Sequence, residues 1–473
     1  MKKIFLFISL IFLFGCFKSH VLSSVDASCD RETTQDNIST SWFQFIDYEY
    51  IGDVDILFVI DNSRTMEEEQ QTLVEEAPEM IYNLILQDNI LINSLHIGVI
   101  STDLGIGPYG GLINSCDEEG DRGELQHTPN PNIEGCSDIG EIPLYLSYST
   151  QTTDLDTIVQ QFRCIVALGI DGCGIEQPLE AARKALIDQT LPGGVNEGFL
   201  RDNAILVIVF LTDEDDCSIA DYSMFDEATS VNLNIICTLQ VIENSDYLYP
   251  VSYFVDAISS LKEDPRDIIV TLIGGIPLDW NGTEADIYNR IEIDWTNYEQ
   301  IPVCSTIYGN AMPSARLVSF ALSFAETAVI QSICATEWGR VVFHALREKI
   351  FSRIRGITGC LQQDISNYSC KVMEILKDTS SCPHPEYQTQ LPDYYITDDG
   401  LPHTVCEIQR SDWNPLGDPR DLNHNHIHDY GEEVNLAGWY YLPAQFSQRG
   451  CPQILFTMNA LPQPDSLIKI ECE

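Results

Sequence analysis

The sequence predicts an α/β protein, with helices flanking a parallel sheet, long disulfide-stapled insertions, and a small cysteine-rich β region at its C-terminal end. Two observations predict the sheet. Apolar strand-like runs alternate with helical patterns over residues 53–356, which is typical of parallel strands joined by crossover helices. Two of these runs lead into an aspartate: Asp61 follows the first directly, and Asp213 follows the second after Thr212. A third observation sets residues 357–473 apart, because cysteines, prolines and short β-like runs dominate there.

The first half of the expected sheet begins with "VDILFVI" at 54–60, a continuous apolar run suited to a central parallel strand. Residues 66–87 carry a helical stripe, and Pro78 within it predicts a kink or two short helices. "LHIGVIS" at 95–101 is expected to be the next strand. Residues 103–150 are rich in Gly, Asn, Asp and Pro, and so predict a long inserted loop with a function or a disulfide staple.

The second half continues the alternation and contains another insertion. The expected helices are 176–188, 251–262 and 337–355, the strands are 204–211 and 267–275, and the insertion is 278–312.

The N-terminus predicts export and a lipid anchor. Residues 1–16 form a lipoprotein-type signal peptide: a basic start, an apolar run too short to span a membrane, and a lipobox-like Gly15-Cys16. Cys16 would carry palmitate-type acyl chains, and residues 17–52 would be a tether and lead-in. The predicted location is the cell envelope. The outer membrane is expected because Cys16 is followed by Phe17 and not by an aspartate, which would resemble the inner-membrane retention signal of enteric bacteria. An ordinary signal peptide with a chance cysteine is the alternative.

Composition restricts the partners. The formal net charge is −47, from 25 basic and 72 acidic residues, which disfavours nucleic acid and favours cations. The chain has 16 cysteines, so 15 remain beside Cys16. An exported chain with this many cysteines is expected to form disulfides, and the odd number leaves at least one thiol free or paired with another chain.

The stretch "DILFVIDNSRTM" is a candidate metal site. Asp61, Ser63 and Thr65 alternate after a strand, so their oxygens can turn toward one point. Carboxylate and hydroxyl oxygens are hard ligands suited to Mg²⁺, Mn²⁺ or Ca²⁺. The alternative is that Asp61 and Ser63 only cap the following helix.

These residues carry a resemblance to the von Willebrand factor type A family, over about 53–356. Asp61, Ser63 and Thr65 are similar to its metal-ion-dependent adhesion signature Asp-x-Ser-x-Ser, and Asp213 in "LTDE" is similar to its distal aspartate. Further segments, such as "CGIEQPLEA", resemble a cysteine-rich bacterial lipoprotein branch. The resemblance implies a Rossmann-like sheet, bound Mg²⁺ or Mn²⁺, and cell adhesion through the carboxylate of a protein ligand.

The chain departs from the family at one ligand. The family supplies a threonine from a further loop, where "GIDGCGIEQPLEAA" offers Cys173 or Gly174. Glu176 or Asp171 could substitute, or the site could be vestigial.

A second candidate metal site lies at 421–432, in "DLNHNHIHDYGE". Its oxygen side chains have the spacing of an EF-hand calcium loop, with His426 in place of the usual glycine. The expected calcium ligands are Asp421, Asn423, Asn425, Asp429, Glu432 and the main-chain carbonyl of Ile427. Zinc held by His424, His426 and His428 is the alternative.

The function predicted is therefore a lipid-anchored binding protein of the cell envelope that is not an enzyme. The sequence has no GxSxG, HExxH or Walker A signature, and no GxGxxG directly after a strand. The alternative is an envelope scaffold whose metals and disulfides are only structural. A hydrolase using the acidic run Asp213 to Asp216 has the least support.

Overall fold

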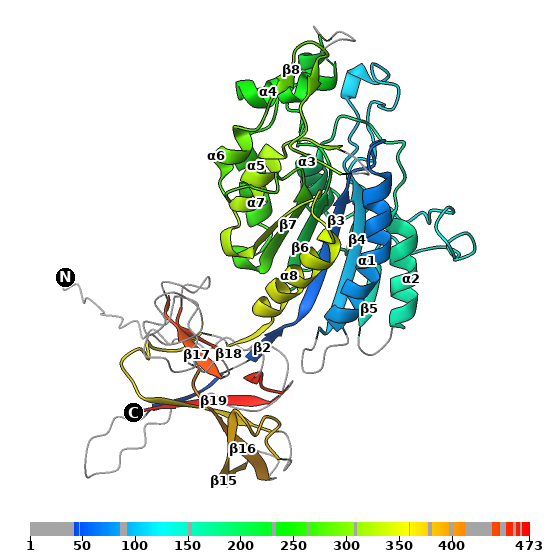
Figure 1. The fold of residues 1–473 in the computed structure, drawn as a ribbon. Coiled ribbons are helices and arrows are strands. Elements are labelled where there is room, and N and C mark those ends of the chain that lie inside the picture. Colours follow the sequence, from blue (N-terminus) through cyan, green and yellow to red (C-terminus); the bar gives the residue numbers. More distant parts are fainter. Residues whose placement is uncertain are drawn as a thin grey trace, which may run out of the picture.

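The computed structural model confirms a mixed α/β chain with a largely parallel sheet flanked by helices and with several disulfides (Figure 1). It describes residues 42–473 except 47, 86–91, 150–153, 227, 229–232, 263, 307–309, 359, 377–380, 397–401, 412–437, 445–450, 457–459 and 464–465.

Six strands form the central sheet in the order β12-β7-β6-β3-β4-β5. The first five run parallel, and β5 is antiparallel to β4. Their bounds are β3 Asp53–Ile60, β4 Ser94–Ser101, β5 Leu146–Ser149, β6 Ile205–Leu211, β7 Ile268–Gly274 and β12 Ala328–Ser332. The chain adds β4 on one side of β3 and β6 on the other, so strand order reverses at β3. Ligand sites in such sheets lie at the carboxyl ends of the strands beside this reversal.

Helices cover both faces of this sheet, which explains why its strands are apolar throughout (Figure 1). One face packs against α1 Glu67–Ile85, α2 Leu155–Val166 and α8 Trp338–Arg353. The other packs against α3 Pro178–Arg183, α5 Val251–Ser259 and α7 Ala315–Leu322. Alternate residues of β3 serve the two cores: Phe58 and Ile60 belong to the first, and Leu57 and Val59 to the second.

Two expected helices differ in detail. The stretch around Pro78 forms one helix, α1, and not two short ones, with Pro78 inside it. The expected helix at 176–188 is shorter, because α3 passes into a π-helical turn at Lys184–Asp188.

Short elements fill the insertions above the carboxyl ends of the strands. They are α4 Ile236–Glu243, α6 Glu284–Tyr288, the strand pairs β8 Ile293–Asp294 with β9 Glu299–Gln300 and β10 Cys304–Ser305 with β11 Asn310–Ala311, and the 3-10 turns Gly107–Tyr109, Tyr222–Phe225 and Leu233–Ile235. Two further 3-10 turns, Pro265–Asp267 and Ala325–Thr327, lead directly into β7 and β12. Four disulfides hold this α/β unit: Cys116–Cys173, Cys136–Cys164, Cys217–Cys237 and Cys304–Cys334.

The remaining strands form two antiparallel sheets, ordered β1-β19-β14-β16-β15 and β17-β18-β13-β2. Their bounds are β1 Trp42–Ile46, β2 Tyr48–Ile51, β13 Arg355–Thr358, β14 Cys370–Ile375, β15 Gln388–Ile396, β16 Pro402–Ile408, β17 Trp439–Leu442, β18 Gln453–Phe456 and β19 Leu467–Cys472. Three disulfides join them: Cys360–Cys451, Cys370–Cys472 and Cys382–Cys406.

The β region begins earlier in the chain than the sequence suggests. β1 pairs with β19 and β2 pairs with β13, although both lie in the expected lead-in 17–52. The expected boundary at 356 also falls inside β13. The strands β1 and β2 therefore belong to the C-terminal sheets.

Candidate functional site

The loop after β3 brings its three predicted oxygen donors to one edge of the sheet. Asp61 is fully buried, and its Oδ1 accepts a hydrogen bond from the Ser63 amide at 2.7 Å. This short turn brings the Ser63 and Thr65 hydroxyl oxygens within 3.4 Å of each other. Gln70 of α1 fixes the loop from behind, because its Nε2 donates to the carbonyl of Asp61 at 2.9 Å.

The loop after β6 supplies two more acids, Asp213 and Glu214. Thr212 ties this loop to the first, because its hydroxyl donates to Asp61 Oδ2 at 2.6 Å. Asp213 is 4% exposed, and Thr65 lies within hydrogen-bonding reach of its carboxylate. The other carboxylate oxygen, Asp213 Oδ1, is buried without a partner. A buried carboxylate oxygen without a hydrogen-bond donor destabilises the folded state, and a cation bound beside it would remove this penalty.

Glu176 comes from a third loop and lies beside Asp61. It is 1% exposed, its Oε2 accepts a hydrogen bond from the Thr102 hydroxyl, and its Oε1 is buried without a partner. Glu176 also lies within hydrogen-bonding reach of the Asp61 carboxylate. Two carboxyls this close need a proton or a cation between them.

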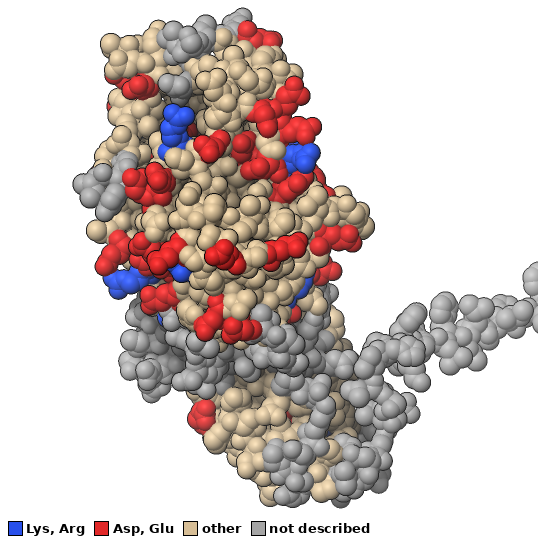
Figure 2. Space-filling model, turned by 90° about the vertical axis from the view of Figure 1, so that its right-hand side faces the viewer, with Lys and Arg blue, Asp and Glu red and all other residues tan. Residues whose placement is uncertain are grey.

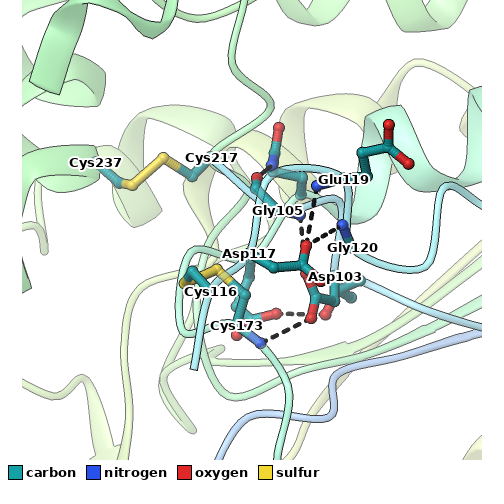
Figure 3. Close-up of a disulfide and its surroundings, with 12 residues drawn as sticks. Asp103, Gly105, Cys116, Asp117, Glu119, Gly120, Cys173, Cys217 and Cys237 are labelled. Atoms are coloured by element: carbon teal, nitrogen blue, oxygen red, sulfur yellow. Dashed lines mark hydrogen bonds between the residues drawn. A yellow bond between two sulfur atoms is a disulfide. The ribbon is translucent and has the colours of Figure 1, made fainter. Parts of the chain in front are cut away.

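Disulfides and main-chain bonds hold the loop that carries Glu176. Cys173 is bonded to Cys116, and its amide donates to the Asp103 carboxylate at 3.0 Å (Figure 3). The Cys217 amide donates to the carbonyl of Glu176 at 2.7 Å, and Cys217 is in turn bonded to Cys237. Asp171 is not linked to the site by any contact that the structure shows, whereas Glu176 is.

The pKa of every acid at this edge is raised above its ordinary value, mainly by burial. Burial, with the charges of Asp61 and Glu214, raises the pKa of Asp213 to about 9. Burial and the charge of Asp61 raise the pKa of Glu214 to about 7. Burial raises the pKa of Asp61, and burial with the Asp61 charge raises that of Glu176 well above its usual range. Among the ion pairs of the described residues, none involves these four acids.

The geometry fits a cation held by a mixed set of oxygens. Two carboxylates from different loops, Asp61 and Asp213, lie beside the Ser63 and Thr65 hydroxyls, and two buried oxygens lack donors. No three His, Cys, Asp or Glu side chains of the described residues are grouped closely enough to hold a metal by themselves. A metal here would therefore depend on the hydroxyls as well as on the acids, with water filling other positions.

The helix-cap alternative does not account for Asp61. α1 begins at Glu67, and the hydrogen bonds of the Asp61 carboxylate go to Ser63 and Thr212.

The last two acids of the run Asp213 to Asp216 are engaged elsewhere. Asp215 accepts hydrogen bonds from the amides of Arg316 and Leu317, at the start of α7. Asp216 is paired with the guanidinium of Arg316 at 3.0 Å and accepts from the Leu179 amide in α3. These two acids connect helices to the site.

Sequence reasoning did not single out Glu214, Thr102 or Thr212. Glu214 follows Asp213 directly, and Thr212 precedes it, so their positions at a strand end were a usable signal. Thr102 follows β4 in the same way. The calcium-loop residues 421–432, the histidines within them and Cys16 lie outside the described residues.

No family model and no curated protein matches this chain. Among solved structures, similarity is found to a proximal thread matrix protein of the mussel byssus, at 8% identity over 64% of this chain and 49% of that one, with a TM-score of 0.29. The human COPII-coat protein Sec24c matches at 9% identity over 94% and 48%, with a TM-score of 0.29.

The pilus adhesin SpaC of Lactobacillus rhamnosus GG matches at 9% identity over 95% of this chain and 44% of its own length, with a TM-score of 0.29. This chain thus spans about half the length of the solved proteins it resembles. Likeness at this level carries no argument about function. In the part of the chain that the structure describes, no helix has the length and apolar character needed to cross a membrane.

Proposed function

We propose that the chain is a lipid-anchored binding protein of the cell envelope, in which a divalent cation at Asp61, Ser63, Thr65 and Asp213 engages a protein partner. The observation that carries the proposal is the meeting of these four side chains from two strand ends, with Asp213 Oδ1 buried and lacking a donor. We also propose membership of the von Willebrand factor type A family, which the sequence resembles, and Mg²⁺ or Mn²⁺ as the bound ion.

The arrangement suits binding through the ion. Thr65 is exposed while Asp61 and Asp213 are buried, so the acids hold the ion from below and the open side faces solvent. An oxygen of the partner would complete the shell there. The face of the molecule seen in Figure 2 carries many more Asp and Glu than Lys and Arg side chains, which does not favour a polyanionic partner such as nucleic acid. Anchoring through Cys16 to the outer membrane, and calcium at 421–432, complete the proposal.

Calorimetric titration of the mature chain with Mg²⁺, Mn²⁺ and Ca²⁺ tests it, for wild type, Asp61→Ala and Asp421→Ala. We expect two separable binding events, each lost in its own variant while the other persists. The matched control is Glu119→Ala, because this carboxylate is 69% exposed and is paired with Arg122, not with a residue of the proposed site. Loss of neither event in Asp61→Ala, with the fold intact, would contradict the proposed site.

An envelope scaffold is the second candidate, and the seven disulfides favour it. In a scaffold the ion would be structural only. Asp61→Ala should then lower the unfolding temperature, and the set of proteins that co-purify with the chain should stay the same. In a binder the same variant should stay folded and lose its partner.

A further inference from the structure

The insertion at 278–312 contains an exposed aromatic hairpin that the proposed cation site does not use. Its strands β8 and β9 pair antiparallel, and the turn between them carries Trp295 and Tyr298. Trp295 is 61% exposed and Tyr298 is 37% exposed, and their rings meet edge to face with the centroids 6.3 Å apart. A pair of large aromatic rings in solvent is typical of a surface that a partner covers.

The base of the hairpin holds these rings in one place. The hairpin lies beside α4, at the end of the α/β unit away from the C-terminal sheets, and the Thr238 hydroxyl of α4 donates to Gln300 Oε1 at 2.8 Å (Figure 1). The Tyr298 amide donates to the carbonyl of Asp294 at 2.8 Å and closes the turn, with Tyr298 at a φ of +55°. A bulky residue rarely adopts this left-handed conformation, and such strained positions are concentrated at functional sites.

The acids beside the two rings have no counter-charge in the protein. Arg290 is the one Lys or Arg between 267 and 315, and its guanidinium is already paired with two other acids. In the part of the chain that the structure describes, no ion pair involves Asp294 or Glu299. These two acids lie directly opposite each other, and like charges in that position destabilise a strand pair. A positive group supplied from outside would remove this repulsion.

We propose that the tip of the β8–β9 hairpin binds a basic segment of a partner protein, with a cationic side chain against Trp295 and Tyr298 and beside Asp294 and Glu299. A cation is attracted to the face of a tryptophan or tyrosine ring, and the planar guanidinium of arginine also stacks on it. The neighbouring carboxylates disfavour an anionic partner and attract a basic one. This surface is separate from the proposed cation site, and binding there needs no metal.

The test uses the full mature chain in chelator and a fluorescein-labelled peptide of four Gly-Arg repeats, with Kd measured by fluorescence anisotropy. We expect Trp295→Ala and Tyr298→Asn each to weaken binding roughly 3-fold, and the double variant roughly 10-fold. Asparagine at 298 removes the ring and tolerates the left-handed turn. Glu299→Gln should weaken binding roughly 2-fold.

Two control variants separate this surface from the general attraction between a basic peptide and an acidic chain. Tyr368→Ala removes an equally exposed ring from the C-terminal region, and Glu119→Gln removes an acid that is 69% exposed. Neither control should change Kd. Circular dichroism shows whether each variant keeps the wild-type fold.

Several outcomes would overturn the proposal. They are absence of peptide binding to wild type, an unchanged Kd in the folded ring variants, and an equal loss in Glu119→Gln and Glu299→Gln. A peptide of Gly-Gln repeats that binds as tightly would show an uncharged partner instead. Phosphatidylcholine vesicles that bind wild type but not Trp295→Ala, without peptide binding, would assign the tip to a membrane. Because chelator is present, failure here leaves the proposed cation site untouched.

Discussion

At the scale of single residues, the carboxyl of Asp213 makes the stability of the protein depend on pH. Its pKa is about 9 in the folded chain, against 3.8 ordinarily, because the group is buried beside Asp61 and Glu214. Between pH 4 and 9 the folded protein therefore holds a proton that the unfolded chain has released. Stability conferred by this group is present below pH 4 and is lost as pH rises, by up to about 1.4 kcal/mol per pH unit.

We predict that Asp213→Asn makes the free energy of unfolding less dependent on pH between pH 4 and 9. In a metal-free buffer the variant should have a higher free energy of unfolding than wild type at pH 8, and the difference should vanish toward pH 4. Saturating Mn²⁺ should reverse the order at pH 8, since the ion requires the ionised carboxylate. Urea unfolding across this pH range measures both effects. A wild type that is at least as stable as the variant at pH 8 in chelator would contradict the raised pKa of Asp213.

Individual residues of the site differ in how far the sequence could predict their positions. Asp61, Ser63, Thr65 and Asp213 were predictable, because carboxyl ends of neighbouring parallel strands meet at one edge. The sequence left open whether Glu176 or Asp171 would lie beside Asp61, because the answer depends on how the Cys116–Cys173 disulfide and the main-chain bonds fold an irregular loop. Spacing rules describe regular elements and leave such loops undetermined.

At the scale of elements, Asp216 links two helices to the end of β6. Its carboxylate is 1% exposed, pairs with Arg316 of α7 at 3.0 Å, and accepts from the Leu179 amide of α3 at 3.0 Å. Arg316 is itself only 7% exposed. Removing the acid would leave a buried guanidinium without its counter-charge and a helix amide without its acceptor.

We predict that Asp216→Ala lowers the free energy of unfolding by about 3–5 kcal/mol. The control is Asp279→Ala, which removes a carboxylate that is 79% exposed and that pairs with Arg290 beside Asp286. This change should alter stability little. Chemical denaturation of the two variants beside wild type makes the comparison. Equal, small losses in both would show that the α3–α7 connection does not depend on this pair.

At the scale of the whole molecule, the α/β unit is inserted between two strands of the β region. β2 pairs with β13 so that Ile51 lies opposite Arg355, and the two ends of the unit 53–354 therefore lie side by side. The sequence predicted the larger sheet, whose long apolar strands alternate with helices. It did not predict β1 and β2, because they are only five and four residues long and their partners lie more than 300 residues away in the chain.

This topology predicts that the two parts differ when the chain is divided. A fragment of residues 53–354 keeps the whole central sheet, both of its cores and four disulfides, and its ends need no further partner. We expect it to fold with a cooperative thermal transition and to bind Mn²⁺ as the full chain does.

A fragment of residues 355–473 lacks β1 and β2, so β19 and β13 each lose one partner strand and become edge strands, and Ile46 is missing from the core. It should show no cooperative transition, even under oxidising conditions, until a peptide of residues 42–52 is added. Thermal unfolding is followed by circular dichroism. If 355–473 alone melts cooperatively and the peptide changes nothing, the N-terminal strands are not needed for these sheets to fold.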